Sequence, residues 1–394
     1  GTARGAGSEN RFILNDTRIS AGNGLRELNI KSSDTETTTN IFLGGDYDTA
    51  KFCIHSCAST GTTEIDYNTV LTSRSVFNNI DNLNFSESSL SGDYQLTATG
   101  DTDSIAGLSL VTGLEGLSLT DFKTITLRDN ISTKEMGLEL IASSIKIDNT
   151  SHEDKTVLIS NSNSGKVTIG DIITRSDDGI VSSPMSSTIS SGNGSSLSID
   201  TKNSHVYLGT VNQLANLSIS KELQDEGSTV IANKIITSDS ISFNNLGTIT
   251  SAQNSDASIN KTLTLEAANN ITLTDSDLIT PDHDVNLTSG DIKLERITAS
   301  NINLDASNIE LSGDLFASND LNLLESNEAT NIILTQDITL TGKMDILSES
   351  NATAKITGSK NLYLTSKNTD IYLSSCNPEG ELNSLSITTL DSSN

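Results

Sequence analysis

A short sequence pattern recurs at intervals near twenty residues toward the end of the chain, and it restricts the folds open to the sequence. Four-residue segments that open on Asn or Asp and carry apolar residues two apart begin at residues 284, 301, 320, 337 and 361 (DVNL, NINL, DLNL, DITL and NLYL). Alternation with a period of two is the signal of a β-strand, because successive side chains of a strand point to opposite faces. Strands this short cannot stabilise themselves, so the equivalents from successive repeats must stack and pair. The repeat therefore predicts an all-β solenoid, a right-handed parallel β-helix.

A second short strand follows the first within each repeat. These second segments begin at residues 291, 308, 331, 345 and 370. If one repeat makes one coil, Ile302, Leu321 and Ile338 should lie above one another in a single inward-facing column. The Asn and Asp residues at the strand starts suit turns, and once stacked they can form ladders of side-chain hydrogen bonds.

The regularity of the pattern predicts the domain organisation. Residues 1–103 are less regular and contain eight of the fourteen aromatic residues and two of the three cysteines, which predicts an irregular β-rich cap over an open solenoid end. Residues 104–376 carry the coils, interrupted by a Ser- and Gly-rich loop near 176–196. Residues 377–394 are interpreted as a tail or a truncated continuation of the coils.

The charge of the chain excludes several classes of partner. The formal net charge is -27, whereas binding to nucleic acid requires clustered Lys and Arg. The same charge disfavours an anionic membrane surface, and no apolar run is long enough to span a bilayer. The sequence begins at Gly1 without a signal peptide, so we interpret it as a processed or excised form.

Two groups of residues are candidates for covalent or metal chemistry. Cys53 and Cys57 are four residues apart, which allows a disulfide if the segment is a tight loop; a metal pair with His55 is the alternative. Cys376 has no evident partner in the sequence. No cofactor is expected, and calcium is the one ion that paired carboxylates suggest. Those weak calcium candidates are Asp275, Asp277, Asp282 and Asp284.

Motifs of known enzyme classes are absent from the sequence, and we expect no catalytic activity. The chain has four histidines, none of them in a metal-binding or nucleophile motif. Glycan-active enzymes need paired carboxylates at a defined separation, and here the carboxylates are scattered and Trp is absent. A groove lined by acids and aromatic rings on one face would change this interpretation.

The coils resemble those of a known group of proteins. Segments such as KTLTLEAANNITLTDSD and SNINLDASNIELSGDL, within residues 104–375, are similar in style to the repeats of filamentous-haemagglutinin-type adhesins and autotransporter passengers. The resemblance implies a secreted protein exposed on the outer membrane of a bacterium, with a β-helical rod and no catalytic residues to carry over.

Three functional hypotheses follow. The first is a non-catalytic adhesin whose rod displays loops to a receptor or glycan on a host or neighbouring cell. The second is a self-assembling surface-layer or filament component, and the third is a glycan-active enzyme or tailspike-like protein. Under the first hypothesis, binding is expected in the loop near 176–196 or in the N-terminal region, since coil bodies vary little in shape.

Overall fold

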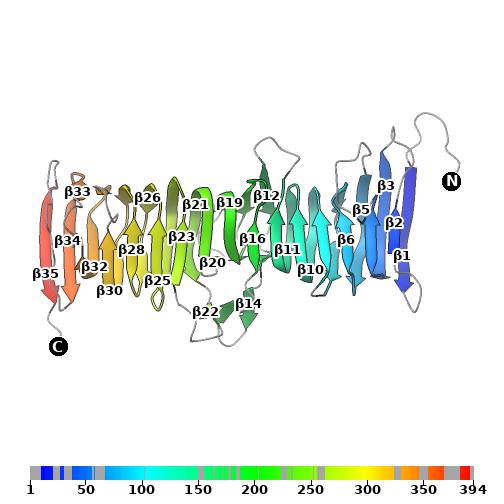
Figure 1. Cartoon of the computed structure of the whole chain (residues 1–394), viewed down its shortest axis with the longest axis horizontal. Coiled ribbons are helices and arrows are strands. Elements are labelled where there is room, and N and C mark those ends of the chain that lie inside the picture. The colour runs from blue at the N-terminus through cyan, green and yellow to red at the C-terminus, as the bar shows by residue number, and fades with distance from the viewer. Residues whose placement is uncertain are drawn as a thin grey trace. The chain divides into compact units, whose positions relative to one another are not determined.

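A computed structural model of the chain consists of β-strands. It describes residues 10–20, 27–30, 38–55, 57, 67–101, 103–149, 155–162, 165–170, 172–175, 179–182, 187–202, 204–222, 229–231, 234–251, 253–254, 262–323, 330–345, 354–367 and 382–390. All regular elements in these ranges are strands, which confirms the all-β prediction (Figure 1). The contacts divide the chain into one unit of residues 1–171 with 185–209 and a second of residues 172–184 with 210–394.

The strands of the first unit pair in parallel with their equivalents about one repeat further along the chain. They are β1 (Asn10–Ser20), β2 (Glu27–Ile30), β3 (Thr39–Asp48), β4 (Lys51–Ile54), β5 (Tyr67–Asn78), β6 (Asn82–Phe85), β7 (Ser88–Gly92), β8 (Gln95–Thr99), β9 (Ile105–Leu108), β10 (Val111–Leu127), β11 (Ile131–Ile147), β12 (Thr156–Asn161), β13 (Val167–Ile169), β16 (Thr188–Ser190), β17 (Ser196–Thr201) and β18 (Val206–Leu208).

Three columns of paired strands make up the first unit. The first column runs through β1, β3, β5, β7, β10, β11, β12 and β17. The second column consists of β8, β13 and β18 together with the later parts of β5, β10 and β11. The third contains β2, β4, β6, β9 and β16 together with the ends of β10 and β11. Strands from Asn10 onward already belong to these columns, and the separate cap at residues 1–103 stays a prediction.

The aromatic residues of the first unit fill the space between its columns. Tyr47, Phe52, Phe77 and Phe85 are fully buried, and the rings of Tyr47 and Phe77 stack with centroids 4.7 Å apart. Phe52 meets Phe77 edge-on at 4.9 Å. Burial of such large side chains is a major source of stability, so the aromatic enrichment noted in the sequence supplies the core of the first coils.

The second unit contains the remaining strands. They are β14 (Ile172–Arg175), β15 (Gly179–Ser182), β19 (Thr210–Lys221), β20 (Thr229–Ile231), β21 (Lys234–Ser251), β22 (Gln253–Asn254), β23 (Thr262–Glu266), β24 (Asn270–Thr280), β25 (Asp284–Thr288), β26 (Asp291–Leu294), β27 (Ile297–Ala299), β28 (Ile302–Asp305), β29 (Asn308–Leu311), β30 (Leu315–Leu323), β31 (Thr330–Leu334), β32 (Ile338–Asp345), β33 (Ala354–Thr357), β34 (Asn361–Lys367) and β35 (Ser384–Leu390).

Three columns of parallel pairs recur in this unit, and each coil visits them in a fixed order. The first column takes β23, β25, β28 and the ends of β30 and β32. The second takes the start of β24, then β26, β29, β31 and β33. The third takes the end of β24, then β27, β30, β32, β34 and β35. One coil therefore contains three strands, and the chain turns a corner after each.

The prediction that Ile302, Leu321 and Ile338 form one column is wrong in part, because each coil has a third strand. Ile302 pairs with Leu321 as expected, but Leu321 continues to Met344 and not to Ile338. Ile338 lies in the third column and pairs with Leu362. The sequence interpretation missed the short strand β27 and its successors, so it placed the segments at residues 337 and 361 in the wrong column.

Side chains that face inward in each column are aliphatic and almost completely buried. Val285, Ile302 and Leu321 are at most 1% exposed, and the intervening residues face solvent. Burying one such side chain contributes roughly 1.5–3 kcal/mol. A chain with 34% hydrophobic residues buries few apolar side chains in each coil. The same contribution is repeated at every coil, so the total stabilisation is large although each coil has a small interior.

Asparagine ladders connect the outward-facing side of successive coils in the second unit. Asn322 donates from Nδ2 to Oδ1 of Asn303 at 2.6 Å, and Asn303 donates in the same way to Asn286 at 2.7 Å. Four further ladders begin at an aspartate, and in each the later coil donates to the earlier one. Their members are Asp239 and Asn269; Asp284 and Asn301; Asp291, Asn308 and Asn331; and Asp337, Asn361 and Asn383. The ladders predicted from the sequence are confirmed.

Several corners place a residue in the left-handed backbone region. Asn245 and Asp275 lie at one corner of successive coils, with φ of 57° and 47°. Asn and Asp tolerate this conformation better than other residues with a side chain, because their short polar groups bond the local backbone.

A small separate sheet includes part of the region where the sequence predicts a loop. β14 and β15 pair antiparallel, and β15 pairs with β22 in parallel. Of these strands, β15 lies within the predicted loop at residues 176–196. β16 also lies within it, and it belongs to the columns of the first unit.

Replacement of Asn303 by alanine tests the ladders. The change leaves the Nδ2 of Asn322 without its acceptor and Oδ1 of Asn286 without its donor, so we expect a loss of about 1–3 kcal/mol in the free energy of unfolding. Urea titration followed by circular dichroism measures it. Thr298→Ala, at an outward position of β27, should change stability by less than about 0.5 kcal/mol; equal effects of the two changes would contradict a stabilising ladder.

Candidate functional site

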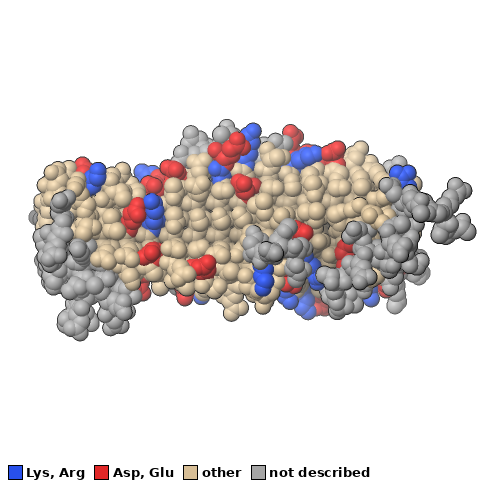
Figure 2. All heavy atoms as spheres, turned by 90° about the horizontal axis from the view of Figure 1, so that it is seen from above, with Lys and Arg blue, Asp and Glu red and all other residues tan. Residues whose placement is uncertain are grey.

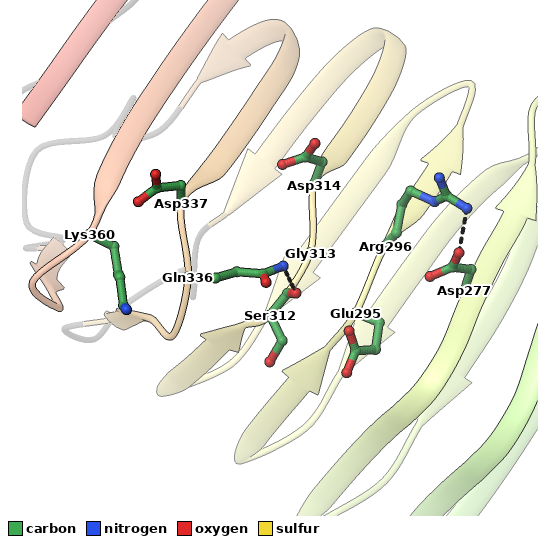
Figure 3. Close-up of a pocket in the computed structure, with 9 residues that line it drawn as sticks. All are labelled: Asp277, Glu295, Arg296, Ser312, Gly313, Asp314, Gln336, Asp337 and Lys360. Carbon is green, nitrogen blue, oxygen red and sulfur yellow. Dashed lines mark hydrogen bonds and ion pairs between the residues drawn. The ribbon is translucent and has the colours of Figure 1, made fainter.

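A polar groove runs along one corner of the second unit, where the second column passes to the third. Five successive coils contribute to it: the bend in β24, the turns after β26, β29 and β31, and the turn before β34. The side chains come from equivalent turns, so they lie one above another (Figure 3). The lining residues are Asp277, Glu295, Arg296, Ser312, Gly313, Asp314, Gln336, Asp337 and Lys360.

Hydrogen bonds between coils fix the turns that line the groove. The amide of Ser312 donates to the carbonyl of Leu294 at 2.8 Å, and the amide of Thr335 donates to the carbonyl of Leu311 at 3.0 Å. The hydroxyl of Thr335 also donates to Ser312 Oγ at 3.1 Å. Each turn is therefore bonded to the turn below it, and the groove has a rigid floor.

Gly313 lets two of these turns approach closely. A Cβ at this position would lie 2.5 Å from the carbonyl carbon of Glu295 and 2.8 Å from the amide nitrogen of Arg296. Only glycine fits there without moving backbone.

Several polar side chains of the groove are held in place by neighbouring residues. Arg296 forms an ion pair with Asp277, and Gln336 donates to the carbonyl of Ser312 (Figure 3). Asp337 accepts from the amide and the Nδ2 of Asn361, both at 2.9 Å. These contacts pre-organise the groove.

The electrostatics of the groove differ between its two ends. The pKa of Glu295 is raised, and burial is the largest cause. The charges of Asp275 and Asp277 also raise this pKa, whereas a hydrogen bond from the backbone amide of Asp275 lowers it. The backbone and side-chain hydrogen bonds of Asn361 lower the pKa of Asp337. Four lining side chains are carboxylates and two are cations, so the groove has a formal charge of -2 when all are ionised.

The calcium candidates from the sequence lie at two different corners. Asp275 and Asp277 are at the bend in β24, whereas Asp282 is exposed in the next turn and Asp284 opens β25. Asp277 pairs with Arg296, and Asp284 accepts from Asn301. Within the part of the chain that the structure describes, no three His, Cys, Asp or Glu residues are grouped so as to hold a metal ion.

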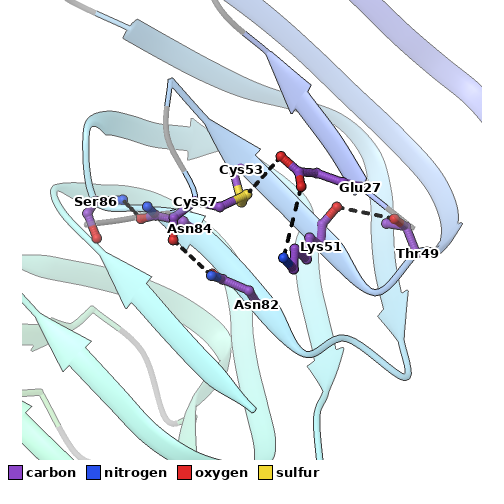
Figure 4. The surroundings of a disulfide bond; sticks show 8 residues. All are labelled: Glu27, Thr49, Lys51, Cys53, Cys57, Asn82, Asn84 and Ser86. Carbon is purple, nitrogen blue, oxygen red and sulfur yellow. Dashed lines mark hydrogen bonds and ion pairs between the residues drawn. A yellow bond between two sulfur atoms is a disulfide. The ribbon is translucent and has the colours of Figure 1, made fainter. Parts of the chain in front are cut away.

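A disulfide joins Cys53 and Cys57 in the first unit (Figure 4). Their Cα atoms are 5.1 Å apart, and His55 between them has a φ of 67°. Cys53 is buried at strand β4, and the carbonyl of Cys57 accepts from Asn82 Nδ2 at 2.9 Å. The loop is thereby attached to two neighbouring coils.

A buried acid lies beneath this loop. The Glu87 side chain is 6% exposed, its Oε2 lies 3.9 Å from Nε2 of His55, and Nδ1 of His55 is 3.2 Å from the hydroxyl of Tyr67. Oε2 of Glu87 and Nε of Arg128 are buried without a hydrogen bond among the described residues. Burial raises the pKa of Glu87, and the charges of His55 and Arg128 lower it by less.

Charged side chains outside these two regions are dispersed. Figure 2 shows acidic and basic residues scattered over the face it presents, with wide areas carrying neither. Cys376 lies outside the described residues. Among the described residues, no helical segment has the length and apolar character needed to cross a bilayer.

Sequence reasoning missed the groove. The signal is present as polar segments between the second and third strands of each coil: Glu295–Arg296, Ser312–Asp314, Thr335–Asp337 and Gly358–Lys360. These segments become equivalent only once the third strand is recognised.

Comparison with protein-family models, curated proteins and solved structures finds no match to this chain. The resemblance to filamentous-haemagglutinin-type repeats therefore stays a prediction.

Gly313→Ala tests the packing of the groove turns. The added methyl group must push the turn away from Glu295 and Arg296, so we expect a loss of about 1–3 kcal/mol in the free energy of unfolding. Gly192→Ala is the control, because a Cβ there meets nothing within 4 Å. Its stability should stay level or rise by up to about 1 kcal/mol. Urea unfolding of both variants measures the difference, and an unaffected Gly313→Ala variant would contradict the close approach.

Glu87→Gln tests the buried acid. Because the pKa of Glu87 is raised, the native state binds the proton more tightly than the unfolded chain does. The stabilisation from this proton is fully present below the ordinary pKa of 4.5, and it is lost as pH rises through the native pKa. The variant should not show this loss, so its urea midpoint should rise relative to that of the parent as pH increases above about 4.5. Asp81→Asn, at an exposed carboxylate, should show no such gain; a difference that stays constant with pH would contradict the assignment.

Proposed function

We propose that the stacked columns of each unit form a right-handed parallel β-helix, and that the chain is an exported bacterial surface protein that binds without catalysis. Three parallel columns per coil, with aliphatic residues inside and Asn, Ser and Thr outside, support the fold. The repeat style shared with filamentous-haemagglutinin-type adhesins supports an adhesin or passenger displayed on the outer membrane.

The observation that carries this proposal is the rigid, repetitive outer surface of the coils. Equivalent turns bonded to one another present polar side chains at fixed spacing, which suits recognition of an extended partner on a host or neighbouring cell. The carboxylates Asp277 and Asp337 are held by Arg296 and Asn361, which favours a role in binding for these two side chains. Binding by pre-organised groups is the function that this arrangement favours.

Self-assembly is the second candidate, and one feature of the third column favours it. Leu385 and Ile387 of β35 are each 49% exposed, whereas their partners Leu362 and Leu364 in β34 are 1% exposed. Within the described residues, the register of β35 is set by its parallel pairing with β34. An unpaired edge with exposed aliphatic side chains is a template for another strand.

Sedimentation velocity and cell binding together separate the two candidates. We expect the purified chain to sediment at one concentration-independent rate, with and without calcium, and to bind saturably to cells in competition with unlabelled protein. Growth of larger species with concentration, abolished by Leu385→Lys with Ile387→Lys, would favour the assembly component. Absence of saturable binding to a panel of epithelial and bacterial cells would contradict the adhesin.

A further inference from the structure

We propose that the groove of the second unit binds a neutral polysaccharide chain lying along the stack of coils. This inference rests on the proposed binding function and adds the site and the chemical class of the ligand. The groove is open along one corner and spans five coils with a volume of about 670 Å³, so an extended ligand can lie across several turns.

The spacing of the turns fits a chain of repeating units. Successive coils are separated by about 4.8 Å, the distance between neighbouring strands. This is comparable to the advance of one pyranose residue along a polysaccharide. A sugar of an extended chain can therefore lie opposite each turn of the groove.

The polar groups of the groove suit sugar hydroxyls. A hydroxyl both donates and accepts, and a planar carboxylate, amide or ammonium group can satisfy it. Asp314, which lines the groove, accepts from the amide of Thr339 at 2.7 Å through Oδ1, and this bond orients the carboxylate. Lys360 and Glu295 add a donor and an acceptor at either side of it.

Aromatic side chains lie next to the groove on the outer face of the third column. Phe316 lies at the start of β30, two residues after Asp314, which belongs to the preceding turn. Tyr363 lies on β34, three residues after Lys360, and the rings of Phe316 and Tyr363 are 39% and 40% exposed. An exposed ring offers an apolar surface with a negative face, on which the C–H groups of a pyranose pack.

Charge selects the class of glycan. The groove carries two more carboxylates than cations, on a chain of net charge -27. An anionic polysaccharide would meet repulsion at low salt, whereas a neutral one would not. The ligand is therefore assigned as a neutral glycan and not a uronate or a sulfated chain.

Binding of the full chain to immobilised hexasaccharides tests the proposal. The neutral probes are hexamers of β-1,4-glucose, α-1,4-glucose, β-1,4-galactose and N-acetyl-β-1,4-glucosamine; the anionic probes are hexagalacturonate and a heparin hexasaccharide. We expect saturable binding to at least one neutral hexamer, little changed by salt. Binding to the anionic probes alone, or to none, would overturn the proposal.

Matched variants locate the binding to the groove. Tyr363→Ala and Asp314→Asn should each raise the Kd for the neutral hexamer by up to about tenfold, because each removes one contact of roughly 1 kcal/mol. Tyr94→Ala is the control, since it removes a ring of similar exposure (44%) in the first unit. Circular dichroism and urea unfolding of every variant confirm that it folds. An equal loss in the control would overturn the location.

The same assays separate this inference from the proposed function. Cell binding that persists in both groove variants would overturn the groove as the adhesive site and leave the adhesin standing. Release of shorter oligosaccharides from a bound hexamer would overturn the non-catalytic function while supporting the groove.

Discussion

Parallel, in-register stacking of short strands is the constraint on which the rest of this structure depends. A three- or four-residue strand has too few contacts to persist alone, so each must find its equivalent in the coils above and below. Register then determines everything else, because a slip of one residue would turn every inward Ile and Leu outward. The pairing of Val285 with Ile302 and of Ile302 with Leu321 shows this register maintained while the number of residues per coil changes.

The variable length of the coils is absorbed at the corners. Coil-to-coil hydrogen bonds join residues 17 apart at Asn303, 19 apart at Asn322 and 23 apart at Asn331, yet the strands remain paired. Additional residues are placed in turns, where they do not disturb the columns. Because the strands are constrained and the corners are not, polar chemistry accumulates at the corners, and the groove lies at one of them.

The sequence predicts the character of the fold better than its detail. Alternation in segments such as NINL is strong enough to predict strands and stacking, and the Asn at their starts predicts the ladders. A three-residue strand such as β27, with Ile297 and Ala299 inward, gives too little alternation to be recognised. That omission moved Ile338 to the wrong column and concealed the equivalence of the turns that line the groove. Likewise, the contact of His55 with Glu87 joins residues from different coils, and no local pattern could indicate it.

The asparagine ladders have a direction. Every amide in the ladders of the second unit donates toward the coil that precedes it in the chain, and Asp284, Asp291 and Asp337, which can only accept, occupy the first positions. A completed coil therefore presents acceptors to the residues that follow. Folding that proceeds from the N-terminal side meets a prepared template at each rung of these ladders.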